Sequence, residues 1–255
     1  MKIKTCLRYP GGKFYGAKHI LPFLKEPHDE YREPFVGGGS IFLAKTLAEK
    51  SNWVNDKDKE LINFYTIISD PSSAEKLYAM LDKEHVSKDR YAYVKAFKPK
   101  NEVQRAYKYF YLNRTSFSGI MVNPRWGYLL GSSLTPENWV KRIIPVAEKF
   151  RQATITSLDF REVLVKNTHR QLMCYIDPPY LVAAKSIYSE NFNTEDHIDL
   201  RDILKSAKYK FVLSYENSPE IKSLYNWANL HTSSWVYYLS EERRQDGREL
   251  IITNF

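Results

Sequence analysis

The residues with the clearest chemical potential in this chain are Asp177-Pro178-Pro179-Tyr180. A short apolar run at 172–176 precedes them and predicts a buried strand whose carboxyl end carries this tetrapeptide. Proline fixes φ and has no N–H group, so the turn presents the Pro178 carbonyl as an acceptor beside the Asp177 carboxylate. Two acceptors next to the aromatic face of Tyr180 suit the amino group of a planar ring, such as the exocyclic amine of a nucleobase.

A second candidate site is the glycine loop Gly37-Gly38-Gly39, between a predicted strand at 31–36 and a predicted helix that starts with Ser40 as N-cap and runs toward Lys50. Glycine lets a ligand approach the backbone closely. The loop lacks the G-x-G-x-x-G pattern of dinucleotide sites, and Gly11-Gly12-Lys13 does not complete a P-loop.

An acidic residue accompanies this loop. Asp56 ends a second predicted strand at 53–54 and lies 17 residues after Gly39, where a carboxylate would meet ribose hydroxyls. These features favour a nucleoside-bearing cofactor without a pyrophosphate. S-adenosylmethionine is one such molecule.

The order of elements predicts an α/β fold. Further strands are expected at 154–157, 172–176, 211–214, 234–238 and 250–253, with helices near 194–206 and 217–228. Alternating strands and helices imply an open, mostly parallel, Rossmann-like sheet. A mostly helical stretch separates the first two strands from the others, so we expect one domain built from 1–58 and 153–255 and a helical insertion at 59–152.

Composition narrows the class of protein. The chain has 255 residues, 43% of them hydrophobic, which is enough for a large core. No apolar run approaches the roughly 20 residues of a membrane-spanning helix, and the first residues lack the apolar core of a signal peptide. The two cysteines are expected to be free thiols in a reducing compartment, and the six histidines lack metal-ligand spacing, so no metal is expected.

The net charge of +8 is concentrated in one segment. From His85 to Gln152 the chain carries 13 Lys/Arg but only four Asp/Glu, with many interspersed aromatic residues. Clustered positive charge is the electrostatic footprint of a protein that binds a polyanion. The alternative is a solvated basic helical face whose aromatic residues belong to a core.

Five ordered sequence blocks carry a family resemblance: 8–13 (RYPGGK), 33–40 (EPFVGGGS), 55–56 (ND), 158–160 (LDF) and 177–180 (DPPY), followed by the C-terminal 249–255 (ELIITNF). In this order they make the chain resemble the Dam-type, α-class DNA adenine-N6 methyltransferases. The resemblance implies a methyltransferase sheet with an inserted target-recognition domain at 59–152. It also implies methyl transfer from S-adenosylmethionine to adenine N6 in double-stranded DNA by base flipping, in the cytoplasm of a bacterial or phage-infected cell.

The resemblance also assigns roles to residues. The catalytic positions are Asp177, Pro178, Pro179 and Tyr180, and the DNA contacts are expected at Arg114, Asn123 and Arg125. The cofactor-binding positions are Tyr9, Lys13, Glu33, Phe35, Gly37, Gly39, Asp56, Asp159, Phe160 and Asp177. Read alone, Asp159 would be the N-cap of a helix at 160–166.

The recognition segment departs from relatives that methylate GATC, because Met121 stands where an arginine is expected, so no target sequence is predicted. Arg243, Arg244 and Arg248, expected in a loop before the last strand, are further candidates for phosphate contacts. A cognate restriction endonuclease is an expected partner that the family does not require. Three alternative functions stay open: cytosine-N4 methylation, RNA adenine methylation, and a catalytically silent DNA-binding module.

Overall fold

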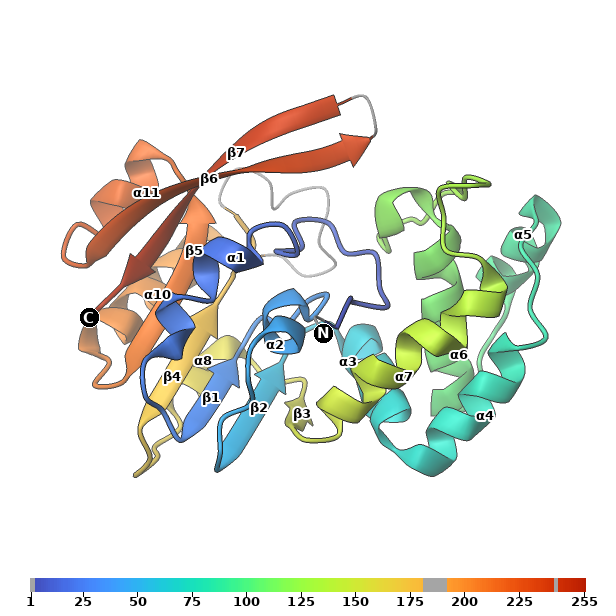
Figure 1. The fold of residues 1–255 in the computed structure, drawn as a ribbon, viewed down its shortest axis with the longest axis horizontal. Coiled ribbons are helices and arrows are strands. Elements are labelled where there is room, and N and C mark those ends of the chain that lie inside the picture. The colour runs from blue at the N-terminus through green and yellow to red at the C-terminus, as the bar shows by residue number, and fades with distance from the viewer. Residues whose placement is uncertain (1–2, 181–191, 241–242) are drawn as a thin grey trace.

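The fold is organised around a sheet of seven strands among the residues that the computed structural model describes, which are 3–180, 192–240 and 243–255 (Figure 1). The strand order is β3-β2-β1-β4-β5-β7-β6. The strands are β1 (Glu30–Glu33), β2 (Ser51–Asn55), β3 (Thr154–Thr156), β4 (Leu172–Ile176), β5 (Lys210–Glu216), β6 (Asn229–Ser240) and β7 (Arg243–Thr253). The first five are parallel, and β7 runs antiparallel to both β5 and β6.

The strand order reverses between β1 and β4, which are neighbours with Glu30 opposite Leu172 and Arg32 opposite Cys174. At such a switch point the connections leave the two strands in opposite directions, and the carboxyl ends of the strands border a crevice. This geometry brings the glycine loop after β1 to the same edge as the tetrapeptide after β4.

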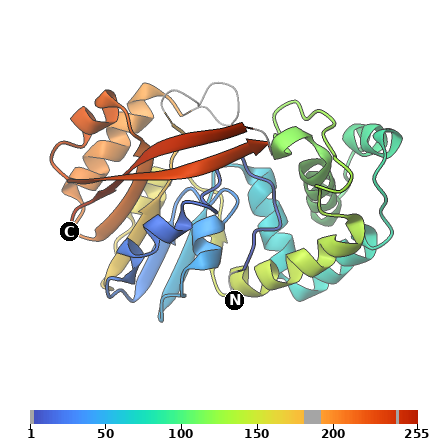
Figure 2. The same ribbon diagram turned by 45° about the horizontal axis from the view of Figure 1, so that its top comes forward.

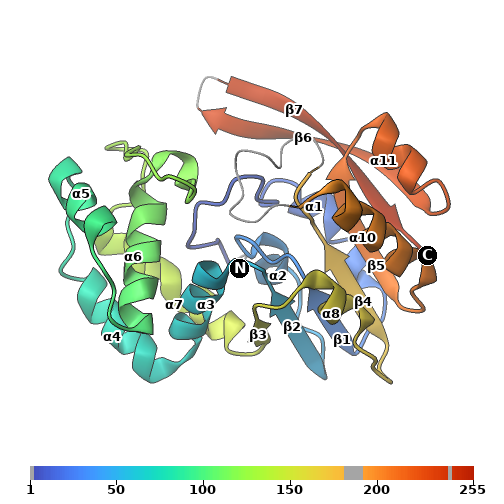
Figure 3. The same ribbon diagram turned by 180° about the vertical axis from the view of Figure 1, so that it is seen from behind.

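Helices cover both faces of the sheet, as the front and rear views show (Figures 1 and 3). One face carries α1 (Ala17–Ile20) and α2 (Ser40–Ala44), and the other carries α8 (Phe160–Val165) and α10 (Thr194–Ser206), with α11 (Pro219–Leu224) beside β5. Alternate residues of β4 belong to the two resulting cores: Met173 and Tyr175 to one, Leu172, Cys174 and Ile176 to the other. Burial on both faces explains why this strand reads as a continuous apolar run.

The stretch between β2 and β3 is mostly helical, as predicted. It contains α3 (Lys59–Ser69), α4 (Pro71–Leu81), α5 (Lys88–Ala96), α6 (Glu102–Thr115) and α7 (Trp139–Phe150). These helices lie together beside the sheet, and the β6–β7 hairpin extends toward them (Figure 2).

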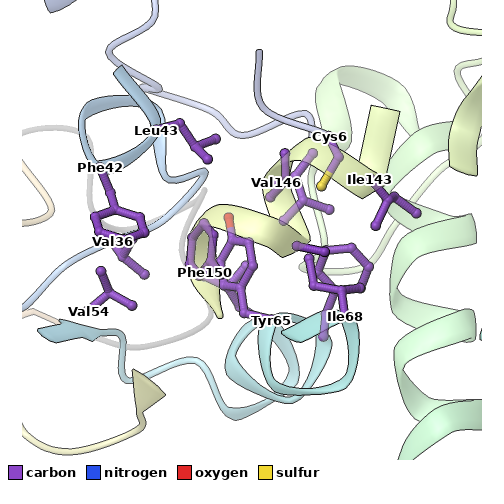
Figure 4. Close-up of a cluster of buried hydrophobic side chains, with 14 of the residues drawn as sticks. Cys6, Val36, Phe42, Leu43, Val54, Tyr65, Ile68, Ile143, Val146 and Phe150 are labelled. Carbon is purple, nitrogen blue, oxygen red and sulfur yellow. The ribbon is translucent and has the colours of Figure 1, made fainter. Parts of the chain in front are cut away.

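The helices share a core with the sheet layer. The ring of Phe150 on α7 stacks on Tyr65 of α3 with centroids 4.0 Å apart, and it meets Phe42 of α2 at 5.1 Å (Figure 4). The basic segment is therefore attached to the glycine loop through a rigid aromatic contact. Its role as a target-recognition domain stays a prediction.

The structure confirms some predicted boundaries and corrects others. The predicted strand at 172–176 and helix at 194–206 coincide with β4 and α10. Helix α2, however, has Gly39 as its N-cap residue, with φ of 70°, in place of Ser40, and it ends at Ala44, well before Lys50. The last two strands are longer than expected, so Arg243, Arg244 and Arg248 belong to β7 and not to a loop.

Helix α2 ends early for a tertiary reason. The Lys149 ammonium group donates to the carbonyl of Leu43 at 3.2 Å and to that of Lys45, so that it satisfies acceptors at the end of the helix. The side chain of Asn52 then holds both the N–H and the carbonyl of Ala48, each at 2.9 Å. None of the described helices is both long and apolar enough to cross a membrane.

Candidate active site

A cavity of about 230 Å³ opens where β1, β2 and β4 end. Its walls hold nearly all the predicted cofactor and catalytic residues: Tyr9, Lys13, Glu33, Phe35, Gly37, Asp56, Asp159, Phe160, Asp177, Pro178, Pro179 and Tyr180. The exception is Gly39, which caps α2 beneath the loop and packs against Phe150. The meeting of these strand ends therefore gathers residues from five separate blocks of sequence into one site.

The glycine loop forms one wall, and Tyr9 lies directly on it. A Cβ atom on Gly37 would be 2.8 Å from Cε1 of the Tyr9 ring, and one on Gly38 would be 2.8 Å from the Tyr9 Cβ. Gly37 also has φ of 46°, in the left-handed region. Hydrogen bonds of Gly37 fix the loop. The Gly37 N–H donates to Asp56 at 2.9 Å, and the Gly37 carbonyl accepts from the Tyr65 hydroxyl at 2.9 Å.

Asp56 thus has a structural role in addition to its predicted cofactor role. One carboxylate oxygen accepts from the N–H of Gly37 at 2.9 Å and the other from the N–H of Asp58 at 3.1 Å. Burial raises the pKa of Asp56 to about 6, although these hydrogen bonds oppose the shift. The carboxylate both holds the loop and faces the cavity.

An aromatic group forms the opposite wall. The rings of Phe35, Phe160 and Phe192 lie with centroids 5.4 to 5.7 Å apart. Phe192 was not predicted, because it stands alone in a polar stretch before α10 and carries no local signal. Two of the ring pairs are tilted and one is edge-on, and aromatic faces of this kind can pack against a planar base.

Asp159 is the N-cap of α8, as its sequence context suggested, and it also lines the cavity. Its carboxylate accepts from Nη1 of Arg161 at 3.0 Å. The same guanidinium binds Asp196 and Asp199 on α10. Arg161 therefore joins the two helices that border the aromatic wall.

Asp177 is held at one of its two carboxylate oxygens. Oδ1 receives Nζ of Lys13 at 2.8 Å and the Ser214 hydroxyl at 2.9 Å, and the Tyr175 hydroxyl lies 2.8 Å from Ser214 Oγ. Among the residues that the structure describes, Oδ2 has no hydrogen-bond partner. The carboxylate is thus fixed in orientation while one oxygen stays available to accept from a substrate amine. Sequence reasoning missed Ser214 and Tyr175, since a single polar residue in an apolar strand has no distinctive pattern.

Glu33 is a buried carboxylic acid behind the glycine loop. Its Oε2 accepts from the Tyr31 hydroxyl at 2.5 Å. Burial raises its pKa to about 8; the Tyr31 hydrogen bond, Lys45 and Lys149 oppose the shift, and Asp177 adds to it. The folded protein therefore favours the neutral form of Glu33 near pH 7.

The walls of the cavity are strongly acidic although the protein is basic. They contain six acidic residues and two lysines: Glu33, Asp56, Asp58, Asp159, Asp177 and Asp196, with Lys13 and Lys57. Even with Glu33 neutral, five acidic side chains outnumber the two lysines. Such a lining repels a pyrophosphate and suits a ligand that carries positive charge, a ribose and a planar base. The described residues contain no group of three or more His, Cys, Asp or Glu side chains arranged to hold a metal.

The predicted DNA-contacting residues lie in different environments, one buried and two exposed. Arg114 is 8% exposed and donates to the Cys6 carbonyl at 3.4 Å, and burial lowers its pKa to about 10. Next to it, the Asn113 side chain bonds both the N–H and the carbonyl of Arg8, each at 2.8 Å. Arg114 therefore lies inside the protein, where it ties the N-terminal segment to α6.

Asn123 and Arg125 are exposed on a loop outside the cavity. The loop is closed by a bridge between Ser116 and Trp126, and it is anchored where the Trp126 ring meets Tyr91 at 5.6 Å. Asn123 has φ of 48°, a conformation that asparagine tolerates better than most residues. The turn presents both side chains to solvent.

The site combines a carboxylate that can accept from an amine with an acidic, nucleoside-sized cavity at the switch point of a parallel sheet. This combination characterises an α/β methyltransferase. The family of D12 class N6 adenine-specific DNA methyltransferases matches residues 9–239, and the chain belongs to this family.

The similar proteins have consistent names. A type II methyltransferase of Lactococcus lactis, M1.LlaDCHI, is 28% identical over 278 residues, covering 100% of this chain and 96% of the relative. A DNA adenine methylase of Vibrio cholerae is 28% identical over 246 residues, covering 90% and 87%. The type II methyltransferase M.MjaIII of Methanocaldococcus jannaschii is 26% identical and spans both chains completely. The protein is therefore a DNA adenine-N6 methyltransferase.

We expect Gly37→Ala to weaken binding of S-adenosylmethionine about tenfold or more, because the new methyl group meets the Tyr9 ring and the backbone conformation disfavours any side chain. Calorimetric titration measures this affinity. Gly131→Ala is the matched control, since Gly131 also has positive φ, 85°, but nothing lies within 4 Å of its Cβ position. Equal cofactor affinity in wild type and Gly37→Ala would contradict this account of the loop.

We expect the stability of the protein to depend on pH through Glu33. Its pKa is higher in the folded state than its ordinary value of 4.5, so the folded state binds the proton more tightly and the free energy of unfolding falls as pH rises from about 4.5 to about 8. Glu33→Gln should remove this contribution, so the variant gains stability relative to wild type across that range. Urea unfolding at pH 5, 7 and 9 measures the difference, with the exposed Glu75→Gln as control. A difference that stays constant with pH would refute the assignment.

Proposed function

We propose that the protein binds S-adenosylmethionine in this cavity and methylates adenine N6 in double-stranded DNA after flipping the base out of the helix. The observation that carries the proposal is Asp177, with Oδ1 engaged by Lys13 and Ser214 while Oδ2 has no partner among the described residues. The N6 amine pairs with thymine inside a duplex, so an enzyme can reach it only after the base leaves the stack.

The walls of the cavity fit each part of the proposed cofactor. Phe35, Phe160 and Phe192 would hold the adenine, and Asp56 would accept from ribose hydroxyls. The glycine loop, with Tyr9 and Glu33 beside it, would hold the methionine part. When bound, S-adenosylmethionine supplies an electrophilic methyl group on a sulfonium, whose positive charge suits the acidic lining.

The tetrapeptide would act on the target base. The Asp177 carboxylate and the Pro178 carbonyl accept hydrogen bonds from the amine, which draws electron density toward a nitrogen whose lone pair is otherwise delocalised into the ring. Pro179 keeps the turn rigid, and stacking on Tyr180 replaces part of the lost base stacking, about 1–3 kcal/mol. Catalysis then comes from positioning and from charge aimed at the reacting nitrogen.

The helical part at 59–152 would recognise the DNA. It carries the positive excess, and its loop presents Asn123 and Arg125, whose side chains suit adenine and guanine edges or phosphate. Arg114 would act indirectly, since it is buried against the N-terminal segment. Two of the similar proteins are named type II methyltransferases, which is a reason to retain a cognate restriction endonuclease as a proposed partner.

The first experiment is methyl transfer from labelled S-adenosylmethionine to unmethylated genomic DNA, followed by nucleoside analysis. We expect label in N6-methyladenine, and a fall in turnover of about 10²–10³-fold or more in Asp177→Ala because the amine loses its charged acceptor. Circular dichroism checks that the variant is folded. Label in N4-methylcytosine would change the assigned base. Transfer only to RNA would change the substrate, and cofactor binding without transfer would indicate a silent binding module.

The proposed DNA surface is tested with Arg125→Ala. Loss of a phosphate contact should weaken binding uniformly across sequences and reduce the slope of log affinity against log salt by about 1, whereas loss of a base contact should relax the target sequence. Fluorescence anisotropy at several salt concentrations distinguishes the two. Lys205→Ala, an exposed lysine on α10, is the control with an equal loss of charge. Unchanged affinity, slope and specificity in Arg125→Ala would exclude this loop from the interface.

A further inference from the structure

A second buried carboxylate lies behind the tetrapeptide. Glu249 on β7 is only 2% exposed, and its Oε1 lies 3.9 Å from the Lys13 Nζ. Within the part of the chain that the structure describes, neither of its carboxylate oxygens forms a hydrogen bond of normal length. A buried carboxylate without hydrogen bonds is costly, so its presence at this position calls for a reason.

Lys13 lies between this acid and the acid of the tetrapeptide. Its Nζ is 2.8 Å from Asp177 Oδ1, 3.9 Å from Glu249 and 4.9 Å from the centroid of the Tyr180 ring. The Tyr180 hydroxyl is also buried, and it forms no hydrogen bond with the residues that the structure describes. It lies near Glu249 and lowers the pKa of that carboxyl. Residues from the N-terminal segment, the end of β4 and β7 thus meet around one ammonium group.

Lys13, Asp177 and Glu249 form a triad whose net charge sets the electrostatic environment of the target amine. One lysine paired with one aspartate would be neutral and would weaken Asp177 as an acceptor. With Glu249 ionised, the three groups carry a net charge of −1. The nitrogen gains positive charge as it attacks the methyl group, before it loses a proton, so a residual negative charge at this position stabilises the transition state more than the ground state.

We propose that Glu249 is a positioning residue for methyl transfer: it shares Lys13 with Asp177, so that Lys13 orients the catalytic carboxylate without neutralising it. The inference rests on the proposed role of Asp177. It differs from a purely structural role, because it requires the charge of Glu249 and not only its shape.

The ionisation of Glu249 gives the inference a pH signature. Burial raises its pKa to about 7; Lys13 and the nearby Tyr180 hydroxyl oppose the shift, and Asp177 and Glu216 add to it. Protonation below this pH returns the triad to neutrality. The turnover number should therefore rise with pH through about 7 in wild type.

The test compares Glu249→Gln with wild type in single-turnover methylation of DNA, together with calorimetric titration of S-adenosylmethionine. We expect the rate at pH 8 to fall about 10- to 100-fold, less than for loss of a group that touches the reacting atoms, with cofactor affinity within about twofold. The variant should lose the pH dependence near 7. Glu249→Asp, which keeps the charge, should recover part of the rate and retain the ionisation.

Glu220→Gln is the matched control, because it makes the same change of side chain at an exposed glutamate of α11, outside the cavity. An unchanged rate in Glu249→Gln, or a loss that follows cofactor affinity or thermal stability in parallel, would overturn the inference while leaving the proposed function intact. If Glu249→Gln does not fold, the wild-type profile decides: a rate without an ionisation near pH 7 overturns it. Absence of methyl transfer by wild type would instead refute the proposed function.

Discussion

The packing of the N-terminal segment on bare backbone is the constraint on which the site depends. Tyr9 lies on Gly37 and Gly38 at a distance that no Cβ atom would permit. This contact places the next residues over the cavity, and only from there can Lys13 reach Asp177 at 2.8 Å. The glycines therefore leave the backbone bare on the cavity side, and they bring the distant cation Lys13 to the carboxylate proposed to act in catalysis.

The same segment connects the site to the helices. Asn113 and Arg114, at the end of α6, bind the backbone of Arg8 and Cys6 through buried side chains. Movement of the loop that follows α6 would be transmitted to Tyr9 and Lys13 by hydrogen bonds that are shielded from water. Buried polar contacts of this kind specify one arrangement, because leaving any member unpaired is costly.

The sequence was most informative where local pattern and tertiary environment agree. Strand β4 is apolar throughout because helices cover both of its faces, and α10 starts at an Asn193 capping box that is visible in the sequence. Ordered blocks predicted most of the cavity walls for the same reason. By contrast, no local signal marks Ser214, which reaches Asp177 only because β5 pairs with β4, and the C-terminal block that contains Glu249 assigned that residue no role. Helix α2 was predicted too long because two hydrogen bonds from the distant Lys149, followed by the local contact of Asn52 with Ala48, override a good helical pattern.

Charge separation explains how a basic protein can contain such an acidic pocket. The positive excess lies between residues 85 and 152, on the helices and their loops, where it can meet phosphate, while six acidic residues surround the cavity at the strand ends. A uniform distribution of the same charges would attract DNA phosphates into the cavity and repel a cationic cofactor from it. The helical stretch inserted between β2 and β3 keeps the two electrostatic environments apart. The shared aromatic core around Phe150 fixes the position of the helices relative to the sheet. The fold therefore places a surface suited to a polyanion next to a cavity suited to a cationic ligand.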